Sequence, residues 1–206
     1  MGCATLSYVI YNMIDKKYIH AMKDAYQEYA TIRRDVIVHS GDALHLAKRA
    51  IFAMHRGDLA EAETKMAGAK NICVALQKKY KKKPVFQGEG SYKVALEEYV
   101  EARLLYQFVT KGRIKKITDI TIPSDIYLAG LCDVPGELYR YAVGAAAKRN
   151  LSMVQSCKMM GNSIVGELIE FNFTKYLRTK FDQAKQAVHK LEIIEYELSL
   201  RMSENE

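Results

Sequence analysis

Long stretches of this chain lack the two residues that most often end a helix. The 206-residue sequence has only 3 prolines, and residues 8–56 contain no proline and a single glycine, Gly41. Apolar residues recur there at helical intervals: Tyr18, Met22, Ala25, Tyr29, Ile32, Val36, Leu44, Ala47, Ile51 and Met54. Proline costs about 3 kcal/mol inside a helix, so its absence favours long helices. The pattern predicts one very long helix, or two nearly collinear helices that join near Ser40 and Gly41.

Recognisable stop and start signals divide the middle of the chain. Gly57 is placed to end the first helix, and Asp58 is placed to cap a second helix over about residues 59–80. The lysine-rich and glycine-rich segment 81–91 is predicted to be a mobile basic loop. Residues 94–109 then follow as a helix that is apolar on most of its sides.

The last part of the chain reads in the same way. A short connector over residues 114–122 precedes a helix that can begin near Asp125, and the sequence Asp133-Val134-Pro135-Gly136 is expected to interrupt that helix. Asn150 or Ser152 caps the next helix, and a final helix over about 174–202 carries an apolar stripe that could pack on its own domain or on another subunit. The fold class that follows is all-α, with residues 1–206 taken as a single domain.

Two carboxylates stand on the apolar side of the helix 94–109. Glu98 and Glu101 lie about 60° apart on a helical wheel. Their neighbours on the wheel are Val94, Ala102, Leu105 and Phe108, and the polar face of Lys93, Arg103 and Gln107 lies opposite. A carboxylate inside a helical assembly is costly unless a partner group compensates it.

A second acidic pair, Asp133 and Glu137, is spaced so that both side chains can share one helix face. If the two pairs met, adjacent like charges at about 4 Å would cost roughly 4 kcal/mol each at an effective dielectric near 20. Either some of these carboxyl groups would be protonated, with raised pKa values, or divalent cations would lie between them. Asp133 could also be a simple N-cap if Pro135 starts a new helix.

The overall charge is compatible with a polyanionic partner. The formal net charge is +7, and basic residues group along the first predicted helix, where Arg33 and Arg34 are followed by Lys48 and Arg49. These four residues are candidates for binding nucleic acid. The alternative is an ordinary solvated face whose cations pair with Asp35 and Asp42, and composition alone favours that alternative.

Other motifs point away from several classes of protein. The four cysteines show no zinc-ligand spacing and no disulfide framework, which predicts a reduced, cytoplasmic protein. No apolar run is long enough to span a membrane. The five histidines are isolated on predicted helices and are expected to be structural or surface residues.

Three segments resemble the translin family, and its Trax branch in particular. They are AKRAIFAMHR at residues 47–56, EEYVEA at 97–102 and PSDIYLAGLCDVPGELYR at 123–140. Trax-like proteins carry similar segments in this order: S-K-R-x-I-F-x-x-H-R, E-Y-V-E-A and P-S-D-Y-x-x-G-x-x-D-L-T-G-E. The resemblance covers roughly residues 15–200. One departure is Pro135, which stands where the family usually has threonine.

The resemblance implies a helical bundle of about seven helices that assembles into a closed, hollow oligomer, here expected to be a homo-octamer. It also implies binding of short or single-stranded RNA, with single-stranded DNA as a further ligand. In the Trax branch it implies an endoribonuclease that uses Mg²⁺, with Mn²⁺ as an alternative ion. The acidic residues of that site match Glu98, Glu101, Asp133 and Glu137, which are the four carboxylates that the helical wheel selects.

The sequence-based hypothesis is therefore metal-dependent cleavage of RNA. All four carboxylates are proposed as metal ligands and catalytic groups, and Arg33, Arg34, Lys48 and Arg49 are proposed to neutralise backbone phosphates. The competing hypothesis is a non-catalytic oligomer that binds single-stranded RNA or DNA, as translin does.

Overall fold

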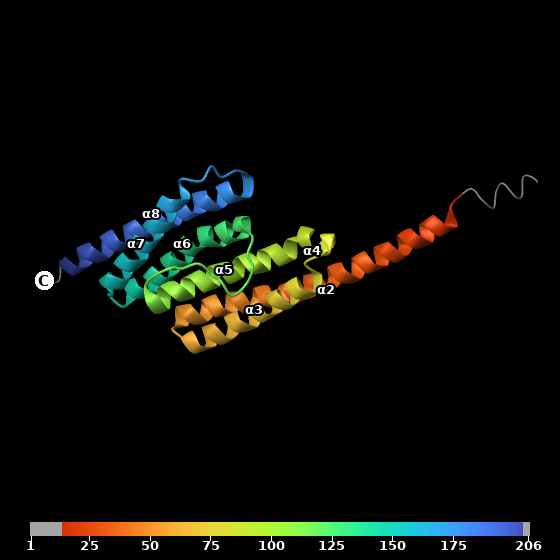
Figure 1. The fold of residues 1–206 in the computed structure, drawn as a ribbon. Coiled ribbons are helices and arrows are strands. Elements are labelled where there is room, and N and C mark those ends of the chain that lie inside the picture. Colours follow the sequence, from red (N-terminus) through yellow and green to blue (C-terminus); the bar gives the residue numbers. More distant parts are fainter. Residues whose placement is uncertain (1–13, 204–206) are drawn as a thin grey trace, which may run out of the picture.

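The computed structural model describes residues 14–203, which form seven helices and no strand (Figure 1). The predicted all-α fold class is thus confirmed. The helices are α2 (Lys16–Arg56), α3 (Leu59–Tyr80), α4 (Pro84–Gly88), α5 (Gly90–Lys111), α6 (Ser124–Ala147), α7 (Leu151–Leu168) and α8 (Lys175–Ser203). None of them combines the length and apolarity needed to cross a membrane.

Helix α2 is continuous through Gly41, so the first of the two alternatives for this stretch is correct from Lys16 onward. Residues 8–13, which the prediction also included, lie outside the described part of the chain. Asp15 caps the helix by accepting a hydrogen bond from the Tyr18 backbone N–H, and Gly57 ends it at φ 82°, a left-handed conformation that favours glycine. Burial begins only at Ile32, and the first half of α2 projects beyond the other helices (Figure 1).

The segment 81–91 differs from the loop that we predicted. It contains the short helix α4, and the Phe86 side chain is buried with its ring centroid 4.4 Å from that of Tyr92. Lysine, proline and glycine dominate the composition of the segment, but a single aromatic side chain is enough to attach it to the core. Within α3, Val74 is exposed and Cys73 takes the buried position beside it.

Helix α6 runs through Pro135 without the predicted interruption. Proline removes one backbone hydrogen bond, which costs stability in an isolated helix. Here Val134, Pro135 and Leu138 are all buried, so packing of this face against the core compensates for the lost bond. The prediction was wrong because tertiary packing outweighed local propensity. Helix α6 begins at Ser124, so Asp133 is not an N-cap.

The helices are arranged so that α5 and α6 lie at the centre (Figure 1). Helix α2 packs on α3 and α5, α5 packs on α6, and α6 packs on α7 and α8. One continuous apolar core extends through these layers. The stripe on α8 packs within its own chain through Phe181, Leu191 and Leu198, which was one of the two alternatives. Side chains from α2 and α8 therefore approach the α5–α6 pair from opposite sides.

Candidate carboxylate centre

A glycine sets the distance between the two helices that carry the acidic residues. A Cβ atom on Gly130 of α6 would lie 2.7 Å from the Glu97 carbonyl oxygen and 2.8 Å from Val100 Cβ, closer than real Cβ contacts allow. Glycine at this position lets the α5 and α6 backbones approach closely. Asp133 follows one turn later on α6, so its side chain enters the same interface as the acidic residues of α5.

The four predicted carboxylates are close enough to perturb one another. Burial raises the pKa of Glu101 well above its usual value, and the negative charges of Asp133, Glu98 and Glu137 raise it further. Burial likewise raises the pKa of Glu98, although Lys48 opposes this shift. The structure thus brings side chains from two distant segments into one cluster, as expected from the two pairs. Their roles as metal ligands and catalytic groups stay a prediction.

Asp133 has a cationic partner that the sequence did not indicate. Lys180 of α8 places its Nζ 2.5 Å from Asp133 Oδ2 and 2.7 Å from Glu97 Oε1. The Tyr176 hydroxyl donates a second hydrogen bond to Glu97 Oε1, at 2.8 Å. Burial still raises the pKa of Asp133, although Lys180 lowers it, so the single ammonium does not fully offset the buried negative charge.

The negative charge of Glu137 is compensated by His55 of α2 and by Arg140 of α6. Its Oε2 atom lies 2.5 Å from His55 Nε2 of α2, and Arg140 donates to both of its carboxylate oxygens, at 3.0 and 3.1 Å. Burial opposes ionisation of Glu137, but the His55 hydrogen bond and the Arg140 charge outweigh burial, and the pKa of Glu137 is lowered. This carboxyl group is ionised at neutral pH.

The donor chemistry of the cluster suits a hard divalent cation. Carboxylate oxygens are the ligands that Mg²⁺ prefers, and neither Glu98 nor Glu101 forms a side-chain hydrogen bond or ion pair within residues 14–203. In that same range no three acidic, histidine or cysteine side chains converge tightly enough to hold a metal ion. A cation bound here would need the carboxylates to change rotamer around it.

The four predicted nucleic-acid-binding residues divide into two kinds. Arg33 forms an ion pair with Glu89 at 3.0 Å, and Arg49 lies 3.8 Å from Glu61. Arg34 is exposed, and the exposed Lys48 lies near the carboxylate cluster, since its charge acts on Glu98. The partners of Arg33 and Arg49 are thus glutamates, not the Asp35 and Asp42 of the alternative interpretation. Binding of nucleic acid by these four residues stays a prediction.

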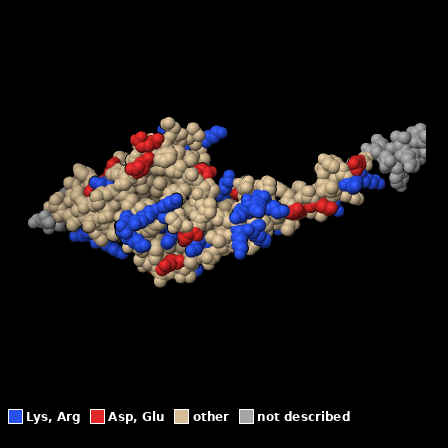
Figure 2. Space-filling view, viewed as in Figure 1, with Lys and Arg blue, Asp and Glu red and all other residues tan. Residues whose placement is uncertain are grey.

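The visible face of the molecule in Figure 2 carries separate groups of Lys and Arg, one of them where α3 ends next to α2 and α4. Lysines of this region are partly paired, since Lys79 bonds Asp35 at 3.0 Å and Lys83 bonds Glu28 at 2.6 Å. Lys81 and Lys82 are exposed. The positive charge is thus spread over several short patches.

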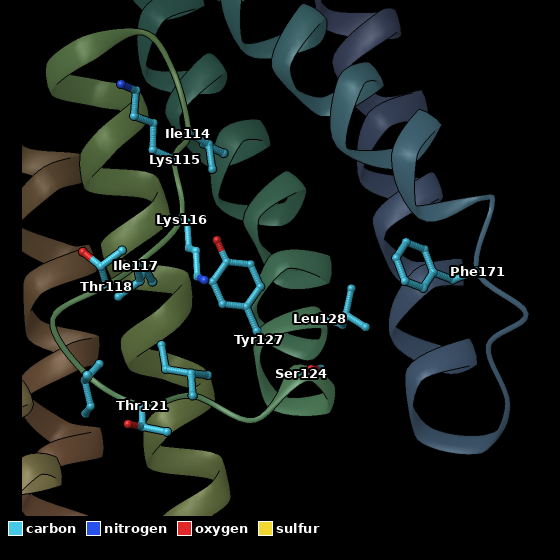
Figure 3. Close-up of a pocket in the computed structure, with 12 residues that line it drawn as sticks. Ile114, Lys115, Lys116, Ile117, Thr118, Thr121, Ser124, Tyr127, Leu128 and Phe171 are labelled. Carbon is cyan, nitrogen blue, oxygen red and sulfur yellow. The ribbon is translucent and has the colours of Figure 1, made fainter.

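A wide groove on the described surface is distinct from the carboxylate cluster. It has a volume of about 880 Å³ and is walled by the connector before α6, by Tyr127 and Leu128 of α6, and by Phe171 (Figure 3). Isoleucines of the connector provide much of its lining, and no acidic, histidine or cysteine side chain reaches it. Its lining offers no carboxylate that could hold a divalent cation, so the carboxylate cluster is the better candidate site for metal-dependent chemistry.

Sequence reasoning missed four members of the cluster: His55, Glu97, Tyr176 and Lys180. Glu97 could have been noticed in the sequence, because it directly precedes Glu98 and stands four residues before Glu101, on the same helix face. In the structure only 9% of Glu97 is exposed. His55 was expected to be a structural or surface residue, and nothing in the sequence indicated that its partner is Glu137. The i, i+4 spacing of Tyr176 and Lys180 predicts that they share one face of α8, but it does not indicate which helix that face contacts.

Comparisons with known proteins give the same fold. The family model described as Translin family matches residues 31–202. A crystal structure described as apo-NeC3PO has a TM-score of 0.81 at 24% identity and covers 91% of this chain and 99% of that chain. A structure of AfC3PO has a TM-score of 0.82 at 20% identity, covering 89% and 98% of the two chains.

A third similar structure is described as a complex of AfC3PO with duplex RNA. Its TM-score is 0.69 at 21% identity, and the match covers 90% of this chain and 95% of that chain. No curated protein sequence matches the chain significantly.

Proposed function

Since this chain belongs to the translin family, we propose that it binds RNA and cleaves it as a Mg²⁺-dependent endoribonuclease of the Trax-like branch. The observation that carries the proposal is the cluster of Glu98, Glu101, Asp133 and Glu137 at the α5–α6 interface, in which Glu101 is buried, the other three are partly buried, and the negative charge is only partly neutralised. The description of a similar structure as a complex with duplex RNA supports RNA as the ligand.

The four carboxylates would hold the Mg²⁺, with Mn²⁺ as a substitute ion. The bound ion would supply an activated water and would neutralise charge on the phosphate. The other groups of this chain prepare the site. Lys180 holds Asp133 through Oδ2, so the other oxygen of Asp133 has no bond to Lys180, while His55 and Arg140 orient Glu137.

Cations along α2 would position the RNA backbone. Arg34 is exposed and Lys48 lies at the edge of the cluster, while Arg33 and Arg49 already have glutamate partners. Contacts of this kind neutralise phosphates without reading bases, so we expect binding that is largely independent of sequence. A cytoplasmic homo-octamer, with RNA reaching the site from inside the assembly, is the accompanying proposal, and single-stranded DNA is a further ligand to test.

A second candidate function is RNA or single-stranded DNA binding without cleavage. A specific observation favours it, because Asp133 and Glu137 already have partners and no three acidic, histidine or cysteine groups of the described chain converge on one point. In that case the cluster would be a structural ion network.

The two functions are separated by incubating the purified protein with labelled single-stranded and duplex RNA, in Mg²⁺ or in EDTA. We expect cleavage only with Mg²⁺, and its loss in the variants Glu98→Ala, Glu101→Ala and Asp133→Ala, with RNA retention on a filter unchanged. The exposed Glu167→Ala is the matched control and should cleave normally. Full cleavage by Glu101→Ala and Asp133→Ala would refute the site, and retention without any cleavage by the unaltered protein would establish the second function.

The proposed phosphate contacts are tested by the salt dependence of RNA binding. Arg34→Glu should weaken binding and reduce the slope of log affinity against log salt by about 1, because one phosphate contact is lost. Lys111→Glu, at the exposed end of α5, is the control of equal charge change. An unchanged slope in Arg34→Glu would mean that Arg34 belongs to an ordinary solvated face and does not contact phosphate.

A further inference from the structure

Lys180 is an unusually enclosed cation. Its side chain is only 12% exposed, and its Nζ bridges Glu97 Oε1 of α5 and Asp133 Oδ2 of α6. The Tyr176 ring, one turn earlier on α8, lies 5.2 Å from the same Nζ. One ammonium from α8 thus joins the two central helices at the edge of the carboxylate cluster.

The ion pair of Lys158 with α8 is a useful comparison, because it is of the ordinary kind. Lys158 of α7 bonds Glu195 of α8 at 2.5 Å, with side chains 27% and 21% exposed. That pair joins one cation to one carboxylate. Lys180 instead meets two carboxylates, and one of them, Asp133, also acts on the nine-tenths buried Glu101.

The carboxylates of the cluster therefore fall into two groups, which differ in whether a cation already pairs with them. Glu97 and Asp133 share the charge of Lys180, whereas Glu98 and Glu101 have no hydrogen-bond or ion-pair partner in residues 14–203. A buried carboxylate without a partner is costly, and a divalent cation removes that cost. Because Lys180 engages Asp133 through Oδ2, it turns the other oxygen of that carboxylate away from the ammonium.

We propose that Lys180 is a resident counter-cation that occupies the Glu97 side of the carboxylate cluster and confines divalent cation binding to the other side, formed by Glu98, Glu101, Glu137 and the oxygen of Asp133 that Lys180 leaves free. This inference rests on the proposed metal-dependent function and assigns Lys180 as a positioning residue for it. Lys180 then acts in place of a second metal ion, and one divalent cation per chain is the expected load of the site.

The direct test is divalent cation binding in Lys180→Met. Removing a positive charge from within a few ångströms should tighten Mn²⁺ binding about tenfold, measured by electron paramagnetic resonance of free Mn²⁺, and should raise the bound number above one per chain. Lys158→Met is the matched control and should leave Mn²⁺ binding unchanged. A purely structural lysine would give unchanged or weaker binding in Lys180→Met, which would overturn the proposal.

Thermal unfolding gives a second, independent measure. In EDTA we expect the Tm of Lys180→Met to fall by roughly 5–15 °C, because a buried pair loses one partner, and we expect Mg²⁺ to restore most of this loss. Lys180→Arg, which keeps the charge, should need no such rescue. An equal fall in Tm with and without Mg²⁺ would contradict the proposal.

A double variant and a separate assay of RNA cleavage complete the test. If Lys180→Met does not fold in EDTA, the double variant Glu97→Gln/Lys180→Met, which removes a carboxylate together with the ammonium, should fold and still bind Mn²⁺ more tightly than the unaltered protein does. Unchanged binding in it would overturn the proposal. Cleavage of RNA by the unaltered protein tests the proposed function separately. If Lys180→Met binds Mn²⁺ more tightly but the unaltered protein does not cleave RNA, the role of Lys180 as a counter-cation is supported and the endoribonuclease activity is refuted.

Discussion

Glu101 and Glu137 belong to one cluster, yet their acidities move in opposite directions. Glu101 is buried and Glu137 is partly buried, and in both residues burial acts against ionisation. The pKa of Glu101 is raised well above its usual value by burial and by neighbouring carboxylates. Burial acts against ionisation of Glu137 as well, but His55 and Arg140 lower its pKa.

The contrast shows that partners, more than depth, decide the charge of a carboxyl group in this interface. Glu137 receives donors from α2 and from its own helix, whereas Glu101 faces Asp133, Glu98 and Glu137. Ionisation is thus favoured at Glu137 and disfavoured at Glu101 within the same cluster.

The largest expected effect comes from moving the helices that carry the two carboxylates. Gly130→Ala would place a Cβ 2.7 Å from the Glu97 carbonyl oxygen, so α5 and α6 must separate. We expect a loss of roughly 3 kcal/mol in the free energy of unfolding, measured with urea, because backbone cannot yield as a side chain can. Gly136→Ala, on the same helix with open space around it, is the control and should stabilise by up to about 1 kcal/mol. Equal behaviour of the two variants would show that the close contact does not hold the site together.

The second largest effect is expected when His55, the hydrogen-bond partner that Glu137 has and Glu101 lacks, is removed. His55→Ala leaves a mostly buried carboxylate without its 2.5 Å hydrogen bond, and we expect a loss of about 2 kcal/mol at neutral pH in urea unfolding. The exposed His189→Ala should change stability by less than about 0.5 kcal/mol. If the loss comes from the carboxylate, adding Glu137→Gln to His55→Ala should recover part of it. No recovery would place the effect in the packing of His55 near the Tyr141 ring, with centroids 6.2 Å apart.

A smaller effect of opposite sign is expected at Glu101. Its raised pKa means that the unaltered protein loses stability as pH rises above the usual carboxyl value of 4.5 and through the higher folded-state pKa. Glu101→Gln should therefore be more stable by about 1–2 kcal/mol at pH 7 in EDTA, and the gain should disappear near pH 4. Mg²⁺ should stabilise the unaltered protein more than the variant. Urea unfolding at both pH values tests this, and a variant that is less stable in EDTA would mean that Glu101 has a partner.

Sequence patterns predicted most helix ends but failed where packing overrides local preference. Gly57, Asp58 and Asn150 act as the caps and terminators that their residue types indicate. Pro135 was expected to break α6, and its ring is instead accommodated in a buried helix face. The burial of Phe86 in α4 was equally hidden, because it depends on Tyr92 lying nearby in space.

The candidate site was predictable to the extent that it depends on spacing along one helix. The pair Glu98 and Glu101 and the pair Asp133 and Glu137 follow from helical periodicity. That the two pairs meet was only a condition in the charge argument, and the resemblance to Trax-like sequences supplied it. Their partners did not follow. His55 is 82 residues from Glu137 in the sequence, and such a contact is set by how α2 packs on the central pair.

The smallest expected effect separates the two partners of Glu137. Arg140 is 46% exposed, so solvent screens its charge, and Arg140→Met should cost only about 0.2–1 kcal/mol in urea unfolding. High salt should reduce this cost, since exposed ion pairs are screened while the buried His55 bond is not. The exposed Arg178→Met, which breaks a similar pair with Asp182, is the control and should behave alike. A loss above about 2 kcal/mol would make Arg140 the dominant partner of Glu137, and the difference between Glu137 and Glu101 would then arise within α6 and not from α2.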